Sequence, residues 1–527
     1  MSIEWTVGNI IRKRADISPE ATAIVFDGDQ ITYQALNKAS NQVARMLQMS
    51  GVRRGDRVAV LLSNCVEFVE IYFAVAKLGA ILVPLNWRLV GRELAYQLND
   101  CDAKALFFHD TFEKTVNEIR GLCKVEYKKF FFLKSVDKEL DCPEYANNYE
   151  VDKLSASPTE PILDEAVRID DPLAIIYTSG TTGTPKGAVV SHEQTFFKNC
   201  QVTVYTEARP GDVMISQMPL FHSGGLFIVL TPAINSGVKI IMGRSFDPYE
   251  FAKDIERYKA TIIFALTTMW KMILAAKVLD SVDTSSVRCV LGGGEMTPPT
   301  IFEELAKRGL YMQQGFGLTE NSAMMMMPKS DILRKIGSVG KPGFFTEGWI
   351  AGENGERLHP GEVGEIVASG PTVMSGYWNL PEATSKTLVG NVLHTGDLGY
   401  MDEEGFFYIV DREKDMYRSG GENVYPAEVE KILLEHTAIN EVAIVGVPDE
   451  KWGQTGKAYI VPKKNQTLTL EDVREFLSGK ISRYKIPTSI ELITEMPRTA
   501  TMKVRKSELS KLHVKGSANA LTKRCVG

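Results

Sequence analysis

Residues 177–187, YTSGTTGTPKG, combine hydroxyl side chains, glycines and one lysine. Hydroxyls and exposed main-chain N–H groups can hold an anion and the lysine adds positive charge, so this composition favours phosphate binding. The spacing of Gly180 and Lys186 fits the P-loop pattern, but Pro185 has no N–H to donate and Gly187 has no hydroxyl for a metal. The stretch is therefore either a different phosphate loop or a surface turn.

Two acidic residues follow glycine-containing turns further along the chain. The segment QGFGLTE, residues 314–320, ends in Thr319 and Glu320, after two glycines that flank Phe316. A carboxylate beside a triphosphate is useful where it holds a hard cation such as Mg²⁺. In HTGD, Asp397 is an acceptor-only side chain that suits two hydroxyl donors. For both acidic residues, capping of a helix or turn is the structural alternative.

Alternating apolar runs and helical patterns predict the strands and helices that position these residues. The run DRVAVLL at 56–62 is followed by a helical pattern from Cys65 to Leu78 and by a second apolar run, AILVPL, which together predict a βαβ unit. Strands that are apolar throughout are typical of parallel sheets covered by helices on both faces, so an α/β fold is predicted. Similar apolar runs occur at 103–109, 128–133, 238–243, 260–266 and 287–294, with a helical pattern at 248–258.

The pattern changes in the last third of the chain. Short alternating runs separated by Gly, Asp and Asn over about 335–411 predict an antiparallel subdomain. From about residue 415, helical patterns and strands return, which predicts a compact α+β domain over 415–527. The boundary is expected in the charged segment VDREKD at 410–415.

Composition narrows the functional class. The chain has 527 residues, 44% hydrophobic and 24% charged, with a net charge of −6 and no basic patch, so a multidomain enzyme acting on small molecules is expected rather than a nucleic-acid binder. The seven cysteines are far apart, which favours a reducing compartment. With no signal-peptide pattern and no long apolar segment, a cytoplasmic protein is expected, while peripheral membrane contact and a homodimer stay open.

Six further segments accompany YTSGTTGTPKG in a fixed order. Together they resemble the adenylate-forming superfamily of acyl-CoA synthetases, luciferases and peptide-synthetase adenylation domains, over essentially the whole chain. The resemblance implies an N-terminal domain, 1–411, with two helix-covered sheets and a small β-barrel-like subdomain, a hinge at 412–414 and a mobile C-terminal domain. The segments are LGGGEMTPP (291–299), QGFGLTE (314–320), HTGD (394–397), VDREKD (410–415), GGENVYPAEVE (420–430) and PRTATMKVRK (497–506).

The resemblance also implies ATP, Mg²⁺ and coenzyme A as cofactors and substrates. Glu320 and Thr178 are the implied metal ligands, Phe316 the residue that stacks on adenine, and Asp397 and Arg412 the ribose contacts. The remaining implied nucleotide and CoA contacts are Ser179, Gly180, Thr181, Thr182, Gly183, Lys186, Gly293, Gly294, Glu295, Gln314, Gly315, Gly317, Thr319, Ile409, Lys414, Arg418, Gly420, Gly421 and Lys503.

Lys503 is the implied catalytic lysine of the first half-reaction, in which it neutralises charge as pyrophosphate leaves. Lys414 matches the hinge about which the small domain swings to bring in the 420–430 segment for the thioester step. Thr178, Lys186, Glu320 and His222 complete the implied catalytic set. His222 in MPLFHSGGL stands at the wall between acyl site and thiol tunnel, or is a packed core histidine. Two positions depart from the family pattern, Met502 in place of glycine and Val392 in place of tryptophan.

The predicted reaction is AMP-forming acyl-CoA synthesis, in which an acid and ATP give acyl-AMP and pyrophosphate, and CoA then gives acyl-CoA and AMP. A ligase that loads a carrier protein, a luciferase-like enzyme and an inactive nucleotide binder are the alternatives. The four candidate acyl segments, 222–228, 265–269, 292–294 and 321–327, contain no lysine or arginine to pair with a second carboxylate. They therefore favour an apolar monoacid, with a medium- or long-chain fatty acid first and an aromatic or alicyclic acid second.

Overall fold

The computed structural model describes residues 5–135, 141–178, 185–419, 422–449, 452–499 and 503–512. The chain divides into two compact units. The first consists of Met1–Gly348 and Ala368–His394, and the second of Trp349–Val367 and Thr395–Gly527. The predicted residues Ser179, Gly180, Thr181, Thr182, Gly183, Gly420, Gly421 and Met502 lie outside the described ranges.

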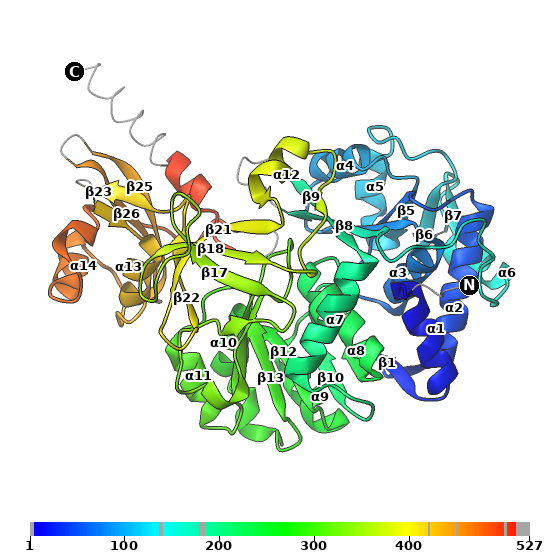
Figure 1. The fold of residues 1–527 in the computed structure, drawn as a ribbon, viewed down its shortest axis with the longest axis horizontal. Helices are drawn as coiled ribbons and strands as arrows, with labels where there is room; N and C mark the ends of the chain where they lie inside the picture. Colours follow the sequence, from blue (N-terminus) through cyan, green and yellow to red (C-terminus); the bar gives the residue numbers. More distant parts are fainter. Residues whose placement is uncertain are drawn as a thin grey trace. The chain divides into compact units, whose positions relative to one another are not determined.

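The first unit contains two large mixed sheets (Figure 1). In one of them, β3 to β6 and the β4–β8 pair are parallel, and β9 is antiparallel to β8. Every residue of β4, β5 and β6 is buried, as expected for strands covered on both faces. Its strands, in spatial order, are β19 (Gly376–Tyr377), β9 (Lys186–Ser191), β8 (Pro172–Thr178), β4 (Ile81–Pro84), β3 (Arg57–Leu61), β5 (Ala105–His109), β6 (Phe130–Leu133) and β7 (Ala146–Asn148).

The other large sheet has a parallel centre and antiparallel edges. β10 to β14 and the β1–β11 pair are parallel, while β2, β15 and β16 run antiparallel to their neighbours. Its order is β16 (Lys341–Pro342), β15 (Met325–Met326), β14 (Met312–Phe316), β13 (Cys289–Gly293), β12 (Ile262–Leu266), β10 (Val213–Ser216), β11 (Lys239–Met242), β1 (Thr22–Phe26) and β2 (Asp29–Thr32).

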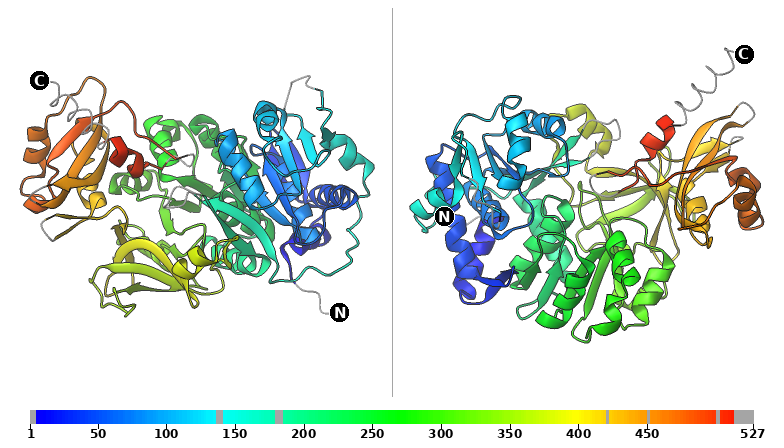
Figure 2. Two further views of the ribbon diagram at one scale, coloured as in Figure 1. Left: turned by 90° about the horizontal axis from the view of Figure 1, so that it is seen from above. Right: turned by 180° about the vertical axis from the view of Figure 1, so that it is seen from behind.

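Helices cover both sheets of the first unit (Figure 2). α7 packs against β9, α8 and the π-helix η2. It therefore connects the sheet that contains β9 to η2 and α8, which lie between β10 and β11 of the other sheet along the chain. The elements are α1 (Val7–Ile17), α2 (Tyr33–Met49), α3 (Val66–Leu78), α4 (Gly91–Asp100), η1 (Asp110–Phe112), α5 (Glu113–Ile119), α6 (Tyr149–Ser155), α7 (His192–Thr206), η2 (Gly224–Leu230), α8 (Thr231–Ser236), α9 (Pro248–Tyr258), α10 (Thr267–Ala275), η3 (Val278–Ser281), α11 (Pro299–Ala306), η4 (Lys329–Asp331) and α12 (Pro381–Thr387).

The second unit is built on two smaller sheets. One contains β17 (Glu347–Ala351), β18 (Gly364–Ser369), β20 (Leu388–Val389), β21 (Val392–Met401) and β22 (Phe407–Arg412), some of which extend into the first unit. The other contains β23 (Tyr417–Ser419), β24 (Glu422–Val424), β25 (Ile439–Asp449), β26 (Gly453–Pro462) and β27 (Ser489–Leu492), with α13 (Pro426–Leu433), α14 (Leu470–Leu477) and η5 (Arg483–Lys485).

The predicted α/β fold class is confirmed. The pattern at 56–84 forms β3, α3 and β4, and the helical pattern at 248–258 forms α9. Within the range predicted as an antiparallel subdomain, β16 and β19 instead join the two large sheets, by pairing with β15 and β9. The 412–414 hinge stays a prediction. Among the described residues, no helix has both the length and the apolar character needed to cross a membrane.

Candidate active site

The YTSGTTGTPKG segment connects β8 to β9. Thr178 and Lys186 are register partners at the ends of these antiparallel strands, and Thr178 Oγ1 donates a hydrogen bond to the Lys186 carbonyl at 3.3 Å. The residues between them fall mainly outside the described ranges. The hairpin places Thr178 and Lys186, two predicted phosphate-site residues, side by side.

A tyrosine that the sequence did not single out connects Lys186 to Glu320. Tyr377 lies on β19, which pairs with β9, and the Lys186 Nζ is 5.0 Å from the centroid of its ring. The Tyr377 hydroxyl donates to Glu320 Oε1 at 2.6 Å. Burial and the Glu320 carboxylate raise the pKa of Tyr377 well above its usual value, so the hydroxyl keeps its proton. Tyr377 therefore holds the predicted magnesium ligand in a fixed orientation.

Replacing Tyr377 with Phe is expected to raise the Mg²⁺ concentration needed for half-maximal pyrophosphate exchange by about 10-fold, because hydrogen-bond partners of ligating carboxylates tune metal affinity. Tyr149→Phe is the matched control, since Tyr149 also donates to a buried carboxylate, that of Glu70 at 2.5 Å. The control is expected to lower stability without changing the Mg²⁺ dependence. An unchanged Mg²⁺ dependence in the Tyr377 variant would contradict the positioning role.

The donor set fits a magnesium ion that also binds the nucleotide. Among the described residues, no group of three or more His, Cys, Asp or Glu side chains gathers to hold a metal. Mg²⁺ commonly uses one or two protein carboxylates together with substrate phosphates and water. Glu320 is half-buried and one of its oxygens is occupied by Tyr377, which leaves the other oxygen for a metal.

Glycines shape the turn between β14 and Glu320. A Cβ on Gly317 would stand 1.3 Å from the Ser322 carbonyl oxygen, so only glycine fits there. Gly293 and Gly315 are register partners on β13 and β14, and a Cβ on Gly293 would lie 2.6 Å from the Gly315 oxygen. The glycine-rich segments 291–299 and 314–320 are thus in direct main-chain contact, as the ends of neighbouring strands.

Predicted nucleotide contacts gather at this strand end. Phe316 is the last residue of β14, and the Thr319 and Ser223 hydroxyls are 3.5 Å apart. Buried side-chain oxygens of Gln314 and Glu295 have no hydrogen-bond partner among the described residues. Because buried polar atoms are normally paired, these acceptors suit the N–H and O–H donors of a bound nucleotide.

His222 precedes an irregular helix. Its Nδ1 accepts a hydrogen bond from the Gly224 N–H at 3.3 Å, and residues Gly224–Leu230 form the π-helix η2. A Cβ on Gly225 would lie 2.2 Å from the Pro219 oxygen, so the main chain doubles back closely at this point. π-helical turns are frequent at functional sites. The half-buried His222 therefore stands at a shaped turn, near the Ser223–Thr319 contact.

A buried lysine on α7 was also missed by the sequence reasoning. Lys198 is 1% exposed, and its Nζ has no hydrogen-bond partner among the described residues. The Nζ lies 5.3 Å from the centroid of the Phe227 ring, within one of the candidate acyl segments. Thr195, Lys198, Asn199 and Val202 are all buried at helical spacing, so the face of α7 that turns inward has polar residues at three of these four positions. No sequence signal indicated this burial, because lysines in helices usually lie on the solvated face.

In the second unit, the predicted ribose contacts form an ion pair. Asp397 and Arg412 are register partners on β21 and β22, and the Arg412 Nε is 3.1 Å from Asp397 Oδ1. Asp397 Oδ2 is buried with no partner among the described residues. Burial raises the pKa of Asp397, while Arg412, Lys503 and Lys414 act to lower it. One accepting oxygen is therefore available for a hydroxyl donor.

The other predicted residues of the second unit lie on the same sheets or close to them. Ile409 pairs with Gly399 on the β21–β22 ladder, and Lys414 lies two residues after the end of β22. Arg418 on β23 donates from Nε to Asn423 Oδ1 at 3.2 Å. The Lys414 charge acts on Asp397.

A hairpin holds the predicted catalytic lysine. The Thr499 N–H donates to the Lys503 carbonyl at 2.7 Å, and the Lys503 N–H donates to Thr499 Oγ1 at 3.1 Å. Arg498 and Val504 form a β-bridge one step further out. These bonds fix the main chain on both sides of the loop and leave the Lys503 side chain exposed.

A half-buried ion pair joins the Lys503 hairpin to α13. Lys506 Nζ is 2.7 Å from Glu430 Oε1, and that carboxylate also accepts a hydrogen bond from the Ile444 N–H. Asp411, just before the predicted hinge, accepts a hydrogen bond from the Ala427 N–H at 2.8 Å through its carboxylate. The 422–430 segment, β25 and the lysine hairpin are therefore bonded to one another.

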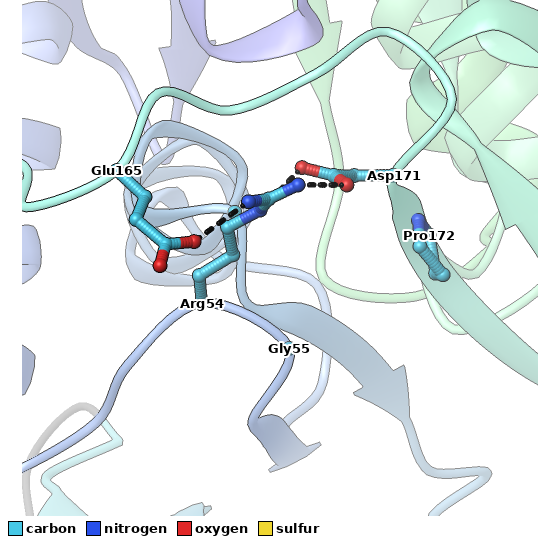
Figure 3. Close-up of a pocket in the computed structure, with 6 residues that line it drawn as sticks. Arg54, Gly55, Glu165, Asp171 and Pro172 are labelled. Atoms are coloured by element: carbon cyan, nitrogen blue, oxygen red, sulfur yellow. Dashed lines mark hydrogen bonds and ion pairs between the residues drawn. The ribbon is translucent and has the colours of Figure 1, made fainter.

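A separate pocket on the first unit is lined by a different set of residues (Figure 3). Its Arg54 forms a two-point hydrogen bond with Asp171, at 2.6 and 2.8 Å, and a third with Glu165 at 2.9 Å. These charges satisfy one another, which is typical of a structural clamp. The pocket contains no predicted site residue, and its lining is Arg54, Gly55, Gly79, Glu165, Asp171 and Pro172.

Comparison with known proteins identifies the family. The family model for the AMP-binding enzyme matches residues 11–378, and the model for the AMP-binding enzyme C-terminal domain matches residues 428–503. Among curated proteins, the chain is 36% identical to a feruloyl-CoA synthase from Amycolatopsis sp, over 94% of this chain and 97% of the relative. It is 35% identical to an indoleacetate–CoA ligase from Aromatoleum aromaticum (97% and 97%) and 33% identical to a 2-succinylbenzoate–CoA ligase from Bacillus cereus (96% and 98%).

Solved structures agree with this assignment. The o-succinylbenzoate CoA synthetase (MenE) from Bacillus subtilis, in complex with its acyl-adenylate intermediate OSB-AMP, matches with a TM-score of 0.84 and 31% identity, over 95% of this chain and 97% of that one. The same enzyme in complex with ATP and magnesium ion matches with a TM-score of 0.83 and 31% identity, over 94% and 98%. A Mycobacterium tuberculosis fatty acyl CoA synthetase matches with a TM-score of 0.76 and 30% identity, over 96% and 98%.

The phosphate hairpin, the positioned Glu320 and the buried Asp397 acceptor are consistent with these matches. The chain belongs to the AMP-binding enzymes of the adenylate-forming superfamily, and it is an AMP-forming carboxylate–CoA ligase that uses ATP, Mg²⁺ and coenzyme A.

Proposed function

We propose that the acid activated by this ligase is an aromatic carboxylic acid. The observation that carries the proposal is the set of acids named for the curated relatives, feruloyl, indoleacetate and 2-succinylbenzoate, each of which contains an aromatic ring. All three relatives align over at least 94% of this chain. The fatty acyl CoA synthetase is a structural neighbour with a lower TM-score than the o-succinylbenzoate enzyme, 0.76 against 0.84.

This proposal replaces the fatty acid that the candidate acyl segments favoured, among them 321–327 with its four methionines. Met324, Met325, Met326 and Met327 are all at most 4% exposed. Met325 and Met326 form β15 and pair with both β14 and β16, so their position is that of a strand inside a sheet. Buried methionines there are explained by packing alone. They supply no argument for a long acyl chain.

The first half-reaction brings a carboxylate towards the α-phosphorus of ATP, and both groups are anionic. We assign Lys186 and the Thr178 hydroxyl to the phosphates, and Lys503 to the charge that develops as pyrophosphate leaves. Glu320, held by Tyr377 at 2.6 Å, would bind a magnesium ion, which would neutralise phosphate charge. Asp397 and Arg412 would hold the ribose hydroxyls through the unpaired Asp397 oxygen.

The second half-reaction transfers the acyl group from AMP to the CoA thiol. Acyl-AMP is a reactive mixed anhydride, so the site must exclude water until the thiol arrives. We assign the segment from Glu422 to Glu430 to this step, with Lys414 as the hinge. His222, at the turn before η2, would line the path between acyl group and thiol.

Measuring CoA-thioester formation with a panel of acids tests the proposal. Ferulate, indole-3-acetate and benzoate derivatives are compared with octanoate, hexadecanoate and malonate, and AMP release is followed with and without CoA. We expect kcat/KM for the best aromatic acid to exceed that for octanoate by about 10-fold or more, since a mismatched pocket discriminates by that order. A preference for octanoate or hexadecanoate would refute the aromatic assignment. Acyl-AMP that accumulates without thioester would point instead to a carrier-protein acceptor.

A further inference from the structure

Lys198 is a buried cation whose role is not explained by the fold. It lies on α7, 1% exposed, and its Nζ has no hydrogen-bond partner among the described residues. The neighbouring Asn199 is also 1% exposed, and neither its Nδ2 nor its Oδ1 has a partner in the same set. Two adjacent buried side chains therefore offer hydrogen-bonding atoms that the described protein does not use.

Two other lysines, one buried and one half-buried, behave differently. Lys77, 6% exposed, donates to Glu160 at 2.6 Å and to Asn37 at 2.9 Å. Lys506 is paired with Glu430 at 2.7 Å. A buried ammonium without such a partner destabilises a fold, and an apolar side chain of the same shape would serve packing better. Lys198 is thus retained at a cost in stability, which is typical of a residue kept for binding.

The surroundings of Lys198 indicate what it would bind. Its Nζ is 5.3 Å from the centroid of the Phe227 ring, which belongs to η2 and to a candidate acyl segment. Burial lowers the pKa of Lys198 to about 7, and the charge of Glu320 acts in the opposite direction. Lys198 and Glu320 share no ion pair, so this carboxylate acts on the lysine only through space. A negatively charged oxygen arriving beside Nζ would restore the full charge of the lysine.

We propose that Lys198, together with Asn199, forms a specificity site that binds a second, ring-borne oxygen of the acid substrate, such as a carboxylate or a phenolic oxygen. The ring itself would lie against Phe227, where aromatic groups pack favourably. This inference rests on the proposed aromatic substrate, and it narrows that class to aromatic acids with a second oxygen acceptor. The candidate acyl segments contain no lysine or arginine, and α7 supplies the missing cation.

Pyrophosphate exchange with matched acids tests the site. Cinnamate is compared with its 2-, 3- and 4-carboxy and 4-hydroxy derivatives, in the native enzyme and in the Lys198→Met and Lys198→Arg variants. A charged hydrogen bond corresponds to about 10- to 100-fold in kcat/KM. We expect at least one derivative to exceed cinnamate by that factor in the native enzyme. Lys198→Met should abolish the preference without loss on cinnamate itself, and Lys198→Arg should retain part of it.

Two outcomes would overturn the inference. An equal loss on all acids in Lys198→Met would place the lysine at the reacting carboxylate or the phosphates. No change on any acid would leave it without a role in recognition. Lys77→Met is the matched control, since it removes a paired buried lysine, and it should lower the melting temperature without altering acid preference. The Lys198→Met variant should have the melting temperature of the native enzyme or a higher one. Lys198→Gln is a second variant that removes the charge of the lysine.

Calorimetric titration of the acids in the absence of ATP separates this inference from the proposed function. If no acid supports exchange, the aromatic-acid proposal fails, while the binding preference still reports on Lys198. Tighter binding of a carboxy- or hydroxycinnamate than of cinnamate by the native enzyme, lost in Lys198→Met, supports the site. Equal binding of all the acids refutes it.

Discussion

The Lys503→Ala variant is expected to exchange pyrophosphate with ATP about 10²- to 10³-fold more slowly than the native enzyme. The reason is electrostatic, because an ammonium group offsets the charge that develops between the carboxylate and the α-phosphate. Thr499 and Lys503 are joined by two hydrogen bonds, at 2.7 and 3.1 Å, so the hairpin itself should survive the substitution. Thioester formation from presynthesised acyl-AMP and CoA should remain within a few-fold of native.

The matched control is Lys511→Ala, which removes an exposed lysine from the same terminal region. It should leave both half-reactions unchanged. Native exchange in the Lys503 variant, or an equal loss in both half-reactions, would contradict the assignment of Lys503 to adenylation alone.

Gly317→Ala should have the second large effect. A Cβ there would lie 1.3 Å from the Ser322 oxygen and 2.4 Å from its carbonyl carbon, and both atoms are main chain. The turn that carries Thr319 and Glu320 must therefore move to admit the methyl group. A displacement of about 1 Å in a positioned site costs about 100-fold in rate, so kcat/KM should fall by at least that factor. Overpacking should also lower stability, by about 1–3 kcal/mol.

Gly121→Ala separates the two effects. No atom lies within 4 Å of a Cβ built at Gly121, so this variant should keep native activity and stability. Thermal melting and pyrophosphate exchange are measured for both variants. A Gly317 variant with native kinetics would show that the turn adapts freely, and would remove the argument that glycine is required there.

The apolar strands and their helices were predictable because local patterns determine them. Every residue of β5 and β6 is buried, and an unbroken apolar run is the sequence form of such strands. The site motifs were predictable for a related reason, since their glycines and acidic residues lie in short segments. QGFGLTE, for example, contains both the glycine that the turn needs and Glu320.

Contacts between distant segments could not be predicted in this way. Tyr377 reaches Glu320 because β19 pairs with β9, and nothing in the residues around 377 indicates that pairing. Lys198 faces inward on a helix that contains polar residues on its buried side, whereas lysines in helices usually lie on the solvated face. Both are single side chains whose role depends on where another part of the chain lies.

The half-buried Glu430–Lys506 pair bears on the timing of catalysis. Because this pair bonds α13 to the hairpin that carries Lys503, the two segments assigned to successive half-reactions are joined in one piece. Neither segment can approach or leave the reacting groups without the other. Under the assigned roles, a single reorientation of that piece would withdraw one set of groups as it delivers the other, so the order of the two chemical steps is built into a mechanical linkage.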